Sequence, residues 1–198
     1  DYVGVGRTDG KEEGEFTPVF YLNDKYEALD KGNFWLSETP DVPGSKGWDA
    51  AIERVASYVK LKDKATGRIF MAINTHYDHV GVTARKESAK LIMKKIQEIV
   101  GSNPAVVTGD FNIEESDEAY KTMVTDAFKM NDAYHMTAHH TGAPYTFHSF
   151  CRISPLQAPK IDFIFITPNV KVLQSHIERE NPKRQLSDHN PHWADLEF

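Results

Sequence analysis

Short apolar segments separated by turn-forming residues constrain the fold of this chain more than any other feature. Residues 54–63 and 68–76 flank a four-residue turn, and along the first segment the side chains alternate between two faces. This pattern predicts an antiparallel hairpin. The remaining predicted strands cover residues 16–22, 104–111, 160–166 and 192–198.

Two further segments have the period of an amphipathic helix. In residues 84–100 the apolar side chains form one stripe, Thr83 can cap the start, and Gly101 can end the helix. Ser116 can cap a second helix. The apolar face of that second helix would carry Tyr120, Met123, Val124 and Ala127. Many strands with two helices between them favour an α/β fold of two packed sheets with helices outside.

The composition narrows the class of protein. The chain has 198 residues, is 40% hydrophobic and carries a formal net charge of −6. This length fits one domain over residues 1–198. The charge shows no basic footprint of the kind that sequence-independent nucleic-acid binding needs, although a local basic groove stays compatible with it. No apolar run is long enough to cross a bilayer, so we expect no membrane insertion. The one cysteine, Cys151, excludes a disulfide within this chain.

Polar groups that packing does not require stand at four predicted strands. They are His76 in NTHYDH, Asp110 and Asn112 in GDFN, Asp162 in KIDFIF, and Asp188 and His189 in LSDHNP. Because side chains alternate along a strand, Asp110 and Asn112 are predicted to point to the same side and to face one ligand together.

Each motif by itself also has a structural interpretation. Asp110 could accept backbone N–H groups in a turn, and His76 could be a satisfied histidine at a sheet rim. Asp188 and His189 could form an ordinary turn. Asp162 stands among apolar neighbours and needs a charged or hydrogen-bonding partner if it is buried. A histidine is one natural partner, because a carboxylate on one imidazole nitrogen leaves the other nitrogen facing substrate.

Taken together and in this order, T-H, G-D-F-N, I-D-F-I-F and S-D-H-x-P resemble the endonuclease/exonuclease/phosphatase family over residues 76–191. The resemblance implies a four-layered α/β sandwich, with two packed mixed sheets flanked by helices. It also implies hydrolysis of a phosphate mono- or diester with a divalent metal. The oxygen and amide donors suit Mg²⁺ or Mn²⁺, whereas zinc would require more His or Cys.

The same resemblance assigns roles to the strand-end residues. Asp110 and Asn112 would position the attacking water and the phosphate oxygens, and with Asp188 they would form the metal site. His189 would contact the phosphate or act as general base, oriented by Asp162. Proton transfer by imidazoles with carboxylate partners suits catalysis near neutral pH.

His76, in the T-H motif, would be a second catalytic imidazole near the leaving group. Further residues match the family less closely, and among them Glu15 would orient His76. Four residues are candidates for substrate contact: Arg54 at a strand start, Arg7 in a glycine-rich loop, and Phe147 and His148 in a long loop. The alternatives are a surface glutamate for Glu15, a surface ion pair for Arg54 and loop packing for Phe147 and His148. The histidines His135, His139 and His140 are predicted to lie in an exposed loop rather than to form a metal cluster.

One departure from the family concerns the beginning of the chain. The family begins with a strand that carries an asparagine, followed by a strand that ends in a metal-binding glutamate, and neither segment precedes Glu15. The chain opens at Asp1, as a processed or trimmed chain would. We therefore expect that it lacks the first strands of the fold and that its metal site is weakened.

The favoured function at this point is a metal-dependent phosphoesterase. A small-molecule, sugar or lipid-headgroup phosphate is preferred as substrate because the chain is acidic and has no Lys/Arg cluster near the motifs. A nuclease acting on DNA or RNA is the alternative enzyme. A non-catalytic module that binds a phosphorylated ligand is the alternative of another class, and the absent glutamate is its only support.

Overall fold

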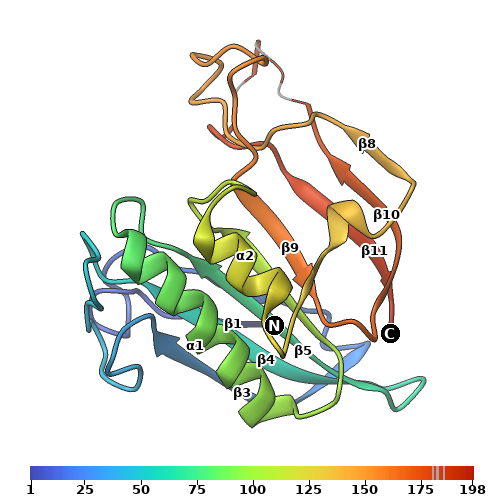
Figure 1. Ribbon diagram of the computed structural model, residues 1–198. Coiled ribbons are helices and arrows are strands. Elements are labelled where there is room, and N and C mark those ends of the chain that lie inside the picture. Colours follow the sequence, from blue (N-terminus) through green and yellow to red (C-terminus); the bar gives the residue numbers. More distant parts are fainter. Residues whose placement is uncertain (180, 182, 185) are drawn as a thin grey trace.

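The computed structural model describes residues 1–198 except positions 180, 182 and 185 (Figure 1). Its helices are α1 (Val82–Val100), α2 (Glu118–Thr125) and the short 3-10 turn η1 (Ala133–His135). Its strands are β1 (Tyr2–Val3), β2 (Val19–Phe20), β3 (Tyr26–Trp35), β4 (Val55–Asp63), β5 (Ile69–His76), β6 (Ala105–Asp110), β7 (Asn131–Asp132), β8 (His140–Gly142), β9 (Asp162–Ile166), β10 (Lys171–Ile177) and β11 (His192–Glu197).

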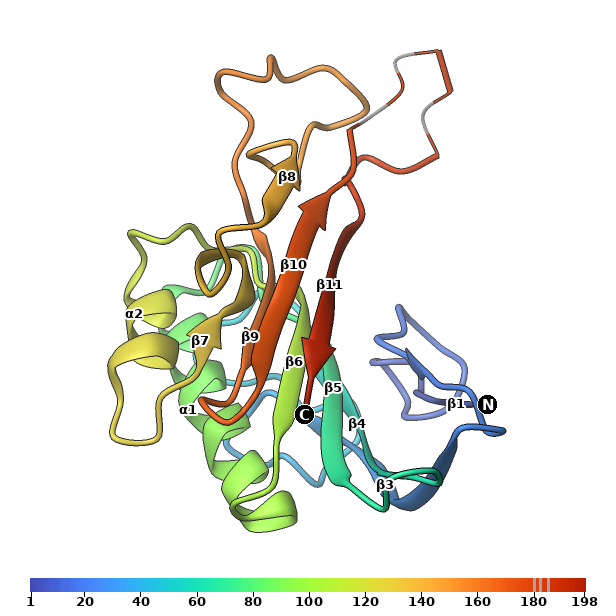
Figure 2. The ribbon, with the colours of Figure 1, turned by 90° about the vertical axis from the view of Figure 1, so that its right-hand side faces the viewer.

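Two mixed sheets pack against each other. The larger sheet has six strands in the order β3-β4-β5-β6-β9-β7, and the smaller has three in the order β11-β10-β8. In Figure 2, β10 and β11 pass in front of β6 and β9, so the two sheets face each other. Apolar side chains fill the space between them: Val106, Ile164, Ile166 and Val172, with Ala194 and Leu196 from β11.

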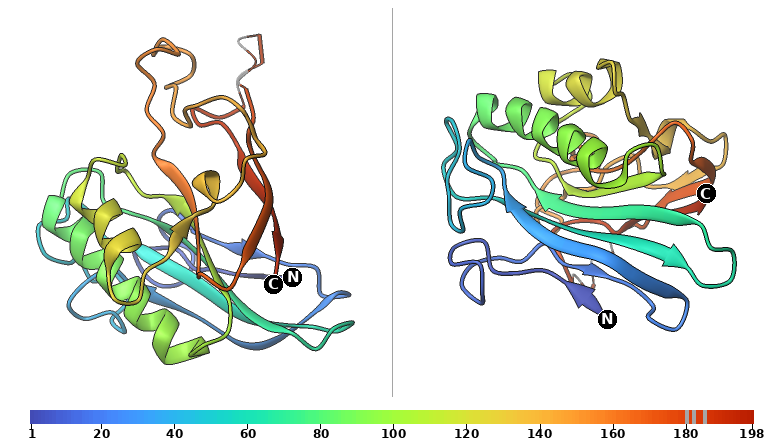
Figure 3. Two further views of the ribbon diagram at one scale, coloured as in Figure 1. Left: turned by 45° about the vertical axis from the view of Figure 1, so that its right-hand side comes forward. Right: turned by 90° about the horizontal axis from the view of Figure 1, so that it is seen from below.

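Both helices cover the opposite face of the six-stranded sheet (Figure 3). The main core lies between these helices and the sheet, and includes Met71, Ile73, Ile92, Ile96, Val107, Phe111, Met123 and Phe165. Among the described residues, neither helix combines the length and apolarity that a membrane span requires.

The expected two packed mixed sheets are therefore present, but four layers are not. The described residues form a layer of helices, the six-stranded sheet and, on its other face, the three-stranded sheet and the two-stranded sheet β1-β2. No described helix covers the outer face of the three-stranded sheet. The exposed side chains of β10 and β11 include charged and polar groups together with Leu173 and Trp193. Lys171 pairs with Glu197 across the two strands at 3.1 Å, and the Gln174 amide donates to Asp195.

The hairpin over 54–76 and the strands ending at Asp110 and Ile166 are confirmed, whereas three other segments differ from expectation. Of the predicted strand 16–22, only Val19–Phe20 forms a strand, while Phe16 makes an isolated bridge to Gly6; Pro18, between them, has no N–H to donate. β3 was not predicted, since it is an edge strand with mostly exposed side chains. β10 was also missed, because a bulge between Val172 and Gln174 breaks its two-residue period.

The helix starts were predicted inaccurately. α1 begins at Val82 with Gly81 as its N-cap, and Thr83 makes no capping bond. Instead Asp49, distant in sequence, accepts hydrogen bonds from the N–H groups of Thr83 (3.1 Å) and Ala84 (2.6 Å). The end of α1 at Gly101 is confirmed.

The second helix also begins later than predicted. The N-cap residue of α2 is Asp117 rather than Ser116. The predicted apolar face is confirmed at Met123, which is fully buried, but Ala127 lies beyond the helix end and is exposed.

Strand register brings three of the predicted site residues to one edge of the six-stranded sheet. β5 and β6 run parallel with His76 paired to Asp110, and β6 and β9 run antiparallel with Asp110 paired to Asp162. The carboxyl ends of β5 and β6 therefore meet the amino end of β9, and three residues far apart in sequence become neighbours.

Gly109 permits this close pairing. Its φ is 152°, and a Cβ there would overlap the carbonyl oxygen of Thr75 on the neighbouring strand. Glycine is therefore required next to Asp110 by the approach of the two backbones.

We expect Gly109→Ala to lower the free energy of unfolding by about 2–4 kcal/mol, because the added methyl group forces β5 and β6 apart. Urea denaturation measures this change. Gly101→Ala is the matched control: Gly101 has φ 60° but nothing within 4 Å of its Cβ position. It should lose only about 1 kcal/mol, the cost of a left-handed backbone. Equal losses in the two variants would contradict the steric role of Gly109.

Candidate active site

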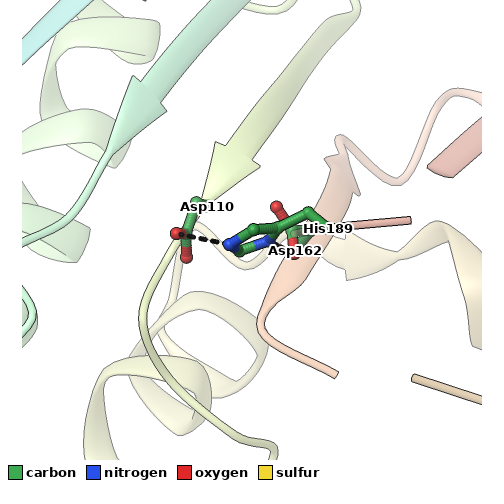
Figure 4. A group of neighbouring side chains, drawn as sticks. All are labelled: Asp110, Asp162 and His189. Carbon is green, nitrogen blue, oxygen red and sulfur yellow. Dashed lines mark hydrogen bonds and ion pairs between the residues drawn. The ribbon is translucent and has the colours of Figure 1, made fainter. Parts of the chain in front are cut away.

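Asp162 and His189 form a close pair at this sheet edge. His189, in the loop before β11, places its Nδ1 2.7 Å from Oδ2 of Asp162. The other ring nitrogen, Nε2, lies 3.8 Å from Oδ2 of Asp110. Figure 4 shows the imidazole reaching from its loop toward the end of β6. The histidine partner expected for Asp162 and the orientation expected for His189 are thus both present in the geometry.

A second imidazole approaches the same carboxylate oxygen from β5. Nε2 of His76 is 3.3 Å from Oδ2 of Asp110, and Nδ1 of His76 is 3.3 Å from Oε1 of Glu15. Asp110 therefore stands between two imidazoles, and each imidazole has a further carboxylate at its Nδ1. Glu15 is half exposed but is bound to the site, because Arg7 donates to its Oε2 at 2.6 Å.

The two imidazoles have opposite pKa shifts. Burial, together with the positive charge of Arg54, lowers the pKa of His76 to about 4. Burial would also lower the pKa of His189, but the hydrogen bond and charge of Asp162, with the charges of Asp110 and Asp188, outweigh it and raise that pKa. At neutral pH, His76 is consequently neutral, while His189 has the stronger tendency to carry a proton.

Asp110 itself is hard to ionise. Burial, reinforced by the nearby charge of Asp162, raises the pKa of Asp110 to about 6. A carboxyl group with such a pKa exchanges its proton near neutral pH, which is where general acid–base catalysis is efficient.

We expected strand alternation to align Asn112 with Asp110, but the structure differs. β6 ends at Asp110, and Asn112 has a left-handed backbone with φ 50°. Its N–H donates to Oδ1 of Asp110 at 2.8 Å, and its Nδ2 donates to the carbonyl of Tyr77 at 3.0 Å. One oxygen of Asp110 therefore accepts a turn N–H, as in the structural interpretation, and the other faces the imidazoles.

Arg54 is buried beside this cluster rather than exposed in a surface ion pair, with 4% of its surface accessible. Its Nη2 lies 3.1 Å from Nδ1 of His79, and its Nε lies 3.7 Å from Oδ2 of Asp78. Burial and the charge of Arg7 both lower the pKa of Arg54, so the two guanidinium groups are near each other. Asp78 and His79 were missed from the sequence, although they belong to the NTHYDH motif. An acid just before a helix start was the available signal for Asp78.

The remaining predicted residues come from the loops around His189. The carbonyl of Asp188 accepts from the N–H groups of His148 and Ser149, and Asp188 is not part of the metal-binding group found among the described residues. The Phe147 ring lies 4.9 Å from the His189 ring. His148 is buried, and its Nδ1 accepts from the N–H of Cys151 at 2.9 Å, as in the packing alternative.

A cavity of about 370 Å³ opens beside the Asp110, Asp162 and His189 side chains. Asp110, Asp162 and His189 line it together with Asn74 and Thr108 of the central strands. This volume can hold a phosphate group and part of the molecule that carries it.

The donor set at this cavity fits a divalent cation. Asp110, Asp162 and His189 each offer a ligand atom, and these atoms lie within 4.8 Å of one another. Two neighbouring carboxylates, one with a raised pKa, leave negative charge that a cation would neutralise. Oxygen donors with one imidazole suit Mg²⁺ or Mn²⁺.

A second acidic group, made of Glu115, Asp132 and His135, has a different character. The ammonium group of Lys160 lies 2.8 Å from Asp132 and 3.2 Å from Glu115, so a side-chain cation already neutralises it. His139 and His140 are exposed, as predicted. This group is a salt-bridge network that joins the two ends of the 131–160 segment to Glu115, in the loop before α2.

Known structures and sequences resemble this chain to different extents. An endonuclease/exonuclease/phosphatase from Bacteroides vulgatus is 57% identical with a TM-score of 0.98, and the match covers 100% of this chain and 76% of that one. The mannosyl-6-phosphatase Bt3783 of Bacteroides thetaiotaomicron is 39% identical with a TM-score of 0.88, over 100% of this chain and 77% of that one. An uncharacterized protein of Acanthamoeba polyphaga mimivirus is 26% identical over 155 residues, which are 67% of this chain.

The chain spans 22% or less of the length of the curated relatives that it matches. No family model matches the sequence. Two solved structures nevertheless match the fold over the full chain, at identities above 30%. The chain belongs to the endonuclease/exonuclease/phosphatase family.

Proposed function

We propose that this chain hydrolyses a phosphate ester of a small molecule, with a sugar phosphate monoester as the favoured substrate and Mg²⁺ or Mn²⁺ as cofactor. The observation that carries the proposal is the Asp110 carboxylate placed between two imidazoles, each of which has its own carboxylate partner. Such an arrangement can move protons at the attacking water and at the leaving oxygen, the two points where ester hydrolysis needs them.

The opposite pKa shifts of His189 and His76 give the two histidines different roles in proton transfer. His189 has the raised pKa and sits over the cavity, so its imidazolium donates to a phosphate oxygen and stabilises the charge that develops there. His76 is neutral and accepts a proton from the attacking water, either directly or through Asp110. That proton is then available for the oxygen of the leaving alcohol.

A divalent cation would act in addition to His76 and His189. Asp110 and Asp162 from the observed group, with Asn112 and Asp188 from the predicted one, would hold it. When bound, it would neutralise the phosphate charge and polarise the P–O bonds. Asn112 keeps one oxygen of Asp110 fixed through its N–H, so the other oxygen stays directed at the site.

The preference for a sugar phosphate rests on charge and on similarity. Arg54 and Arg7 supply two guanidinium groups beside His76, which match the two negative charges of a monoester. A protein that is 39% identical over the whole chain is a mannosyl-6-phosphatase. The net charge of −6 argues against a nucleic acid substrate.

Turnover of esters tests the proposal. Mannose 6-phosphate and p-nitrophenyl phosphate should be hydrolysed with Mg²⁺ and not with EDTA, and faster than bis-p-nitrophenyl phosphate. His189→Ala and His76→Ala should each lower kcat about 100-fold or more, because a proton-transfer or charge-stabilising group is lost.

The exposed His139→Ala is the matched control and should keep full activity. Hydrolysis by His189→Ala at the rate of the unaltered chain would refute the site. Preferential cleavage of the diester would favour the nuclease. Saturable binding of phosphorylated ligands with no product would favour the binding module.

The Asp162–His189 pair has a spectroscopic test. Asp162→Asn should lower the pKa of His189, because the hydrogen bond and charge that raise it are removed. An NMR titration of the imidazole resonances measures the change. Glu15→Gln is the control, since it should lower the pKa of His76 and leave that of His189 unchanged. An unaltered His189 titration in Asp162→Asn would show that the pair does not set the protonation of His189.

A further inference from the structure

The reaction proposed above makes no use of Asp78, although this carboxylate is almost completely buried. Asp78 has 2% of its surface exposed and lies two residues beyond His76, between β5 and α1. A buried carboxylate without partners would be costly, so its contacts should reveal its role.

Those contacts tie three separate segments together. Oδ1 of Asp78 accepts from the N–H groups of Val80 (2.9 Å) and Gly81 (2.7 Å), which lead into α1. Oδ2 accepts from the N–H of Ile52 at 3.3 Å, in the segment that leads into β4. Arg85 of α1 donates to the carbonyl oxygen of Asp78 at 3.2 Å, so its backbone is held as well.

The Oδ2 atom of Asp78 also faces the guanidinium of Arg54. It lies 3.7 Å from Nε, and both side chains are almost fully enclosed. Nη2 of the guanidinium donates to Nδ1 of His79 at 3.1 Å. Within the part of the chain that the structure describes, Nε and Nη1 of Arg54 are buried and have no hydrogen-bond partner.

Buried N–H donors are rarely left without an acceptor. Among the described residues, the Nε and Nη1 donors of Arg54 are unused, and the Asp78 carboxylate partly neutralises the charge of its guanidinium. Arg7 lies close enough to oppose the charge of Arg54, so without Asp78 two like charges would remain with less compensation. The side chain is held beside His76 and Asp110, where an anion would use the remaining donors.

We propose that Asp78 is a positioning residue that holds the Arg54 guanidinium, through its charge and through the backbone of residues 52–54, in place to bind a phosphate oxygen. The role rests on the proposed function, because it assumes that the site receives a phosphate group. Asp78 does not touch the substrate; it acts through Arg54. Asn at position 78 would keep an acceptor for the helix N–H groups but would remove the charge that faces Arg54.

Asp49 offers a matched control. It also accepts hydrogen bonds at the start of α1, from Thr83 and Ala84, but it has no contact with Arg54 among the interactions of the described residues. Asp49→Asn and Asp78→Asn should both reduce the melting temperature, since both weaken the helix start. Only Asp78→Asn should weaken phosphate binding.

The experiment measures inorganic phosphate binding by titration calorimetry, with and without Mg²⁺, on five folded proteins: the unaltered chain, Asp78→Asn, Asp49→Asn, Arg54→Lys and the double variant Asp78→Asn/Arg54→Lys. We expect about tenfold weaker binding in Asp78→Asn, the loss typical of one charge-assisted hydrogen bond, and little change in Asp49→Asn. The double variant Asp78→Asn/Arg54→Lys should bind no more weakly than Arg54→Lys alone, because Asp78 acts through Arg54.

Equal phosphate binding in Asp78→Asn and Asp49→Asn would overturn the inference, as would full additivity in the double variant or no phosphate binding by the unaltered chain. If Asp78→Asn does not fold, NMR of the unaltered chain replaces it. The Nε–H resonance of Arg54 should move when phosphate is added, while that of Arg85 should not; an unmoved Arg54 resonance overturns the inference.

Ester turnover, measured on the same proteins, separates this inference from the function on which it rests. Weakened phosphate binding in Asp78→Asn without hydrolysis by any protein would refute the hydrolase and support the positioning role. Hydrolysis by the unaltered chain, with Asp78→Asn binding phosphate as Asp49→Asn does, would refute the positioning role alone.

Discussion

The hydrogen bonding of β6 to β5 on one side and to β9 on the other is the constraint on which the rest of the site depends. Its register places His76, Asp110 and Asp162 on three adjacent strands at one level of the sheet. Gly109 allows the backbones to approach because it has no Cβ to meet Thr75. Strands are rigid supports, so the three side chains are positioned before any ligand arrives.

Burial shifts the pKa values of the groups that the strand register brings together. Asp110 is buried near another carboxylate, so its pKa is raised. Burial lowers the pKa of His76, whereas the hydrogen bond and charge of Asp162 help to raise the pKa of His189. Groups of similar intrinsic acidity are thereby separated into proton donors and acceptors. The same low-polarity surroundings strengthen the interaction between Arg54 and any anion, which is why the position of this guanidinium matters.

Membership of the endonuclease/exonuclease/phosphatase family defines the scaffold more narrowly than the substrate. One fold can host unrelated substrates, because specificity lies in the loops and side chains around the site. Here those elements are the glycine-rich segment with Arg7, the Phe147 ring against His189 and the polar strands that line the cavity. The site itself is shared between both sheets, since His189 leads into β11 of the smaller one while Asp110 ends a strand of the larger.

The sequence alone determined the hairpin over residues 54–76, the apolar stripe of α1 and the set of polar residues at strand ends, because these depend on local periodicity and residue type. It also indicated a histidine partner for Asp162, since a carboxylate among apolar neighbours needs one. Only the tertiary structure decided which groups share Asp110, because register between distant strands has no local signature. For the same reason it alone showed that Asp49 caps α1, that the Asn112 amide reaches the Tyr77 carbonyl and that Asp78 meets Arg54. Each of these contacts joins segments whose separation along the chain conceals their proximity in space.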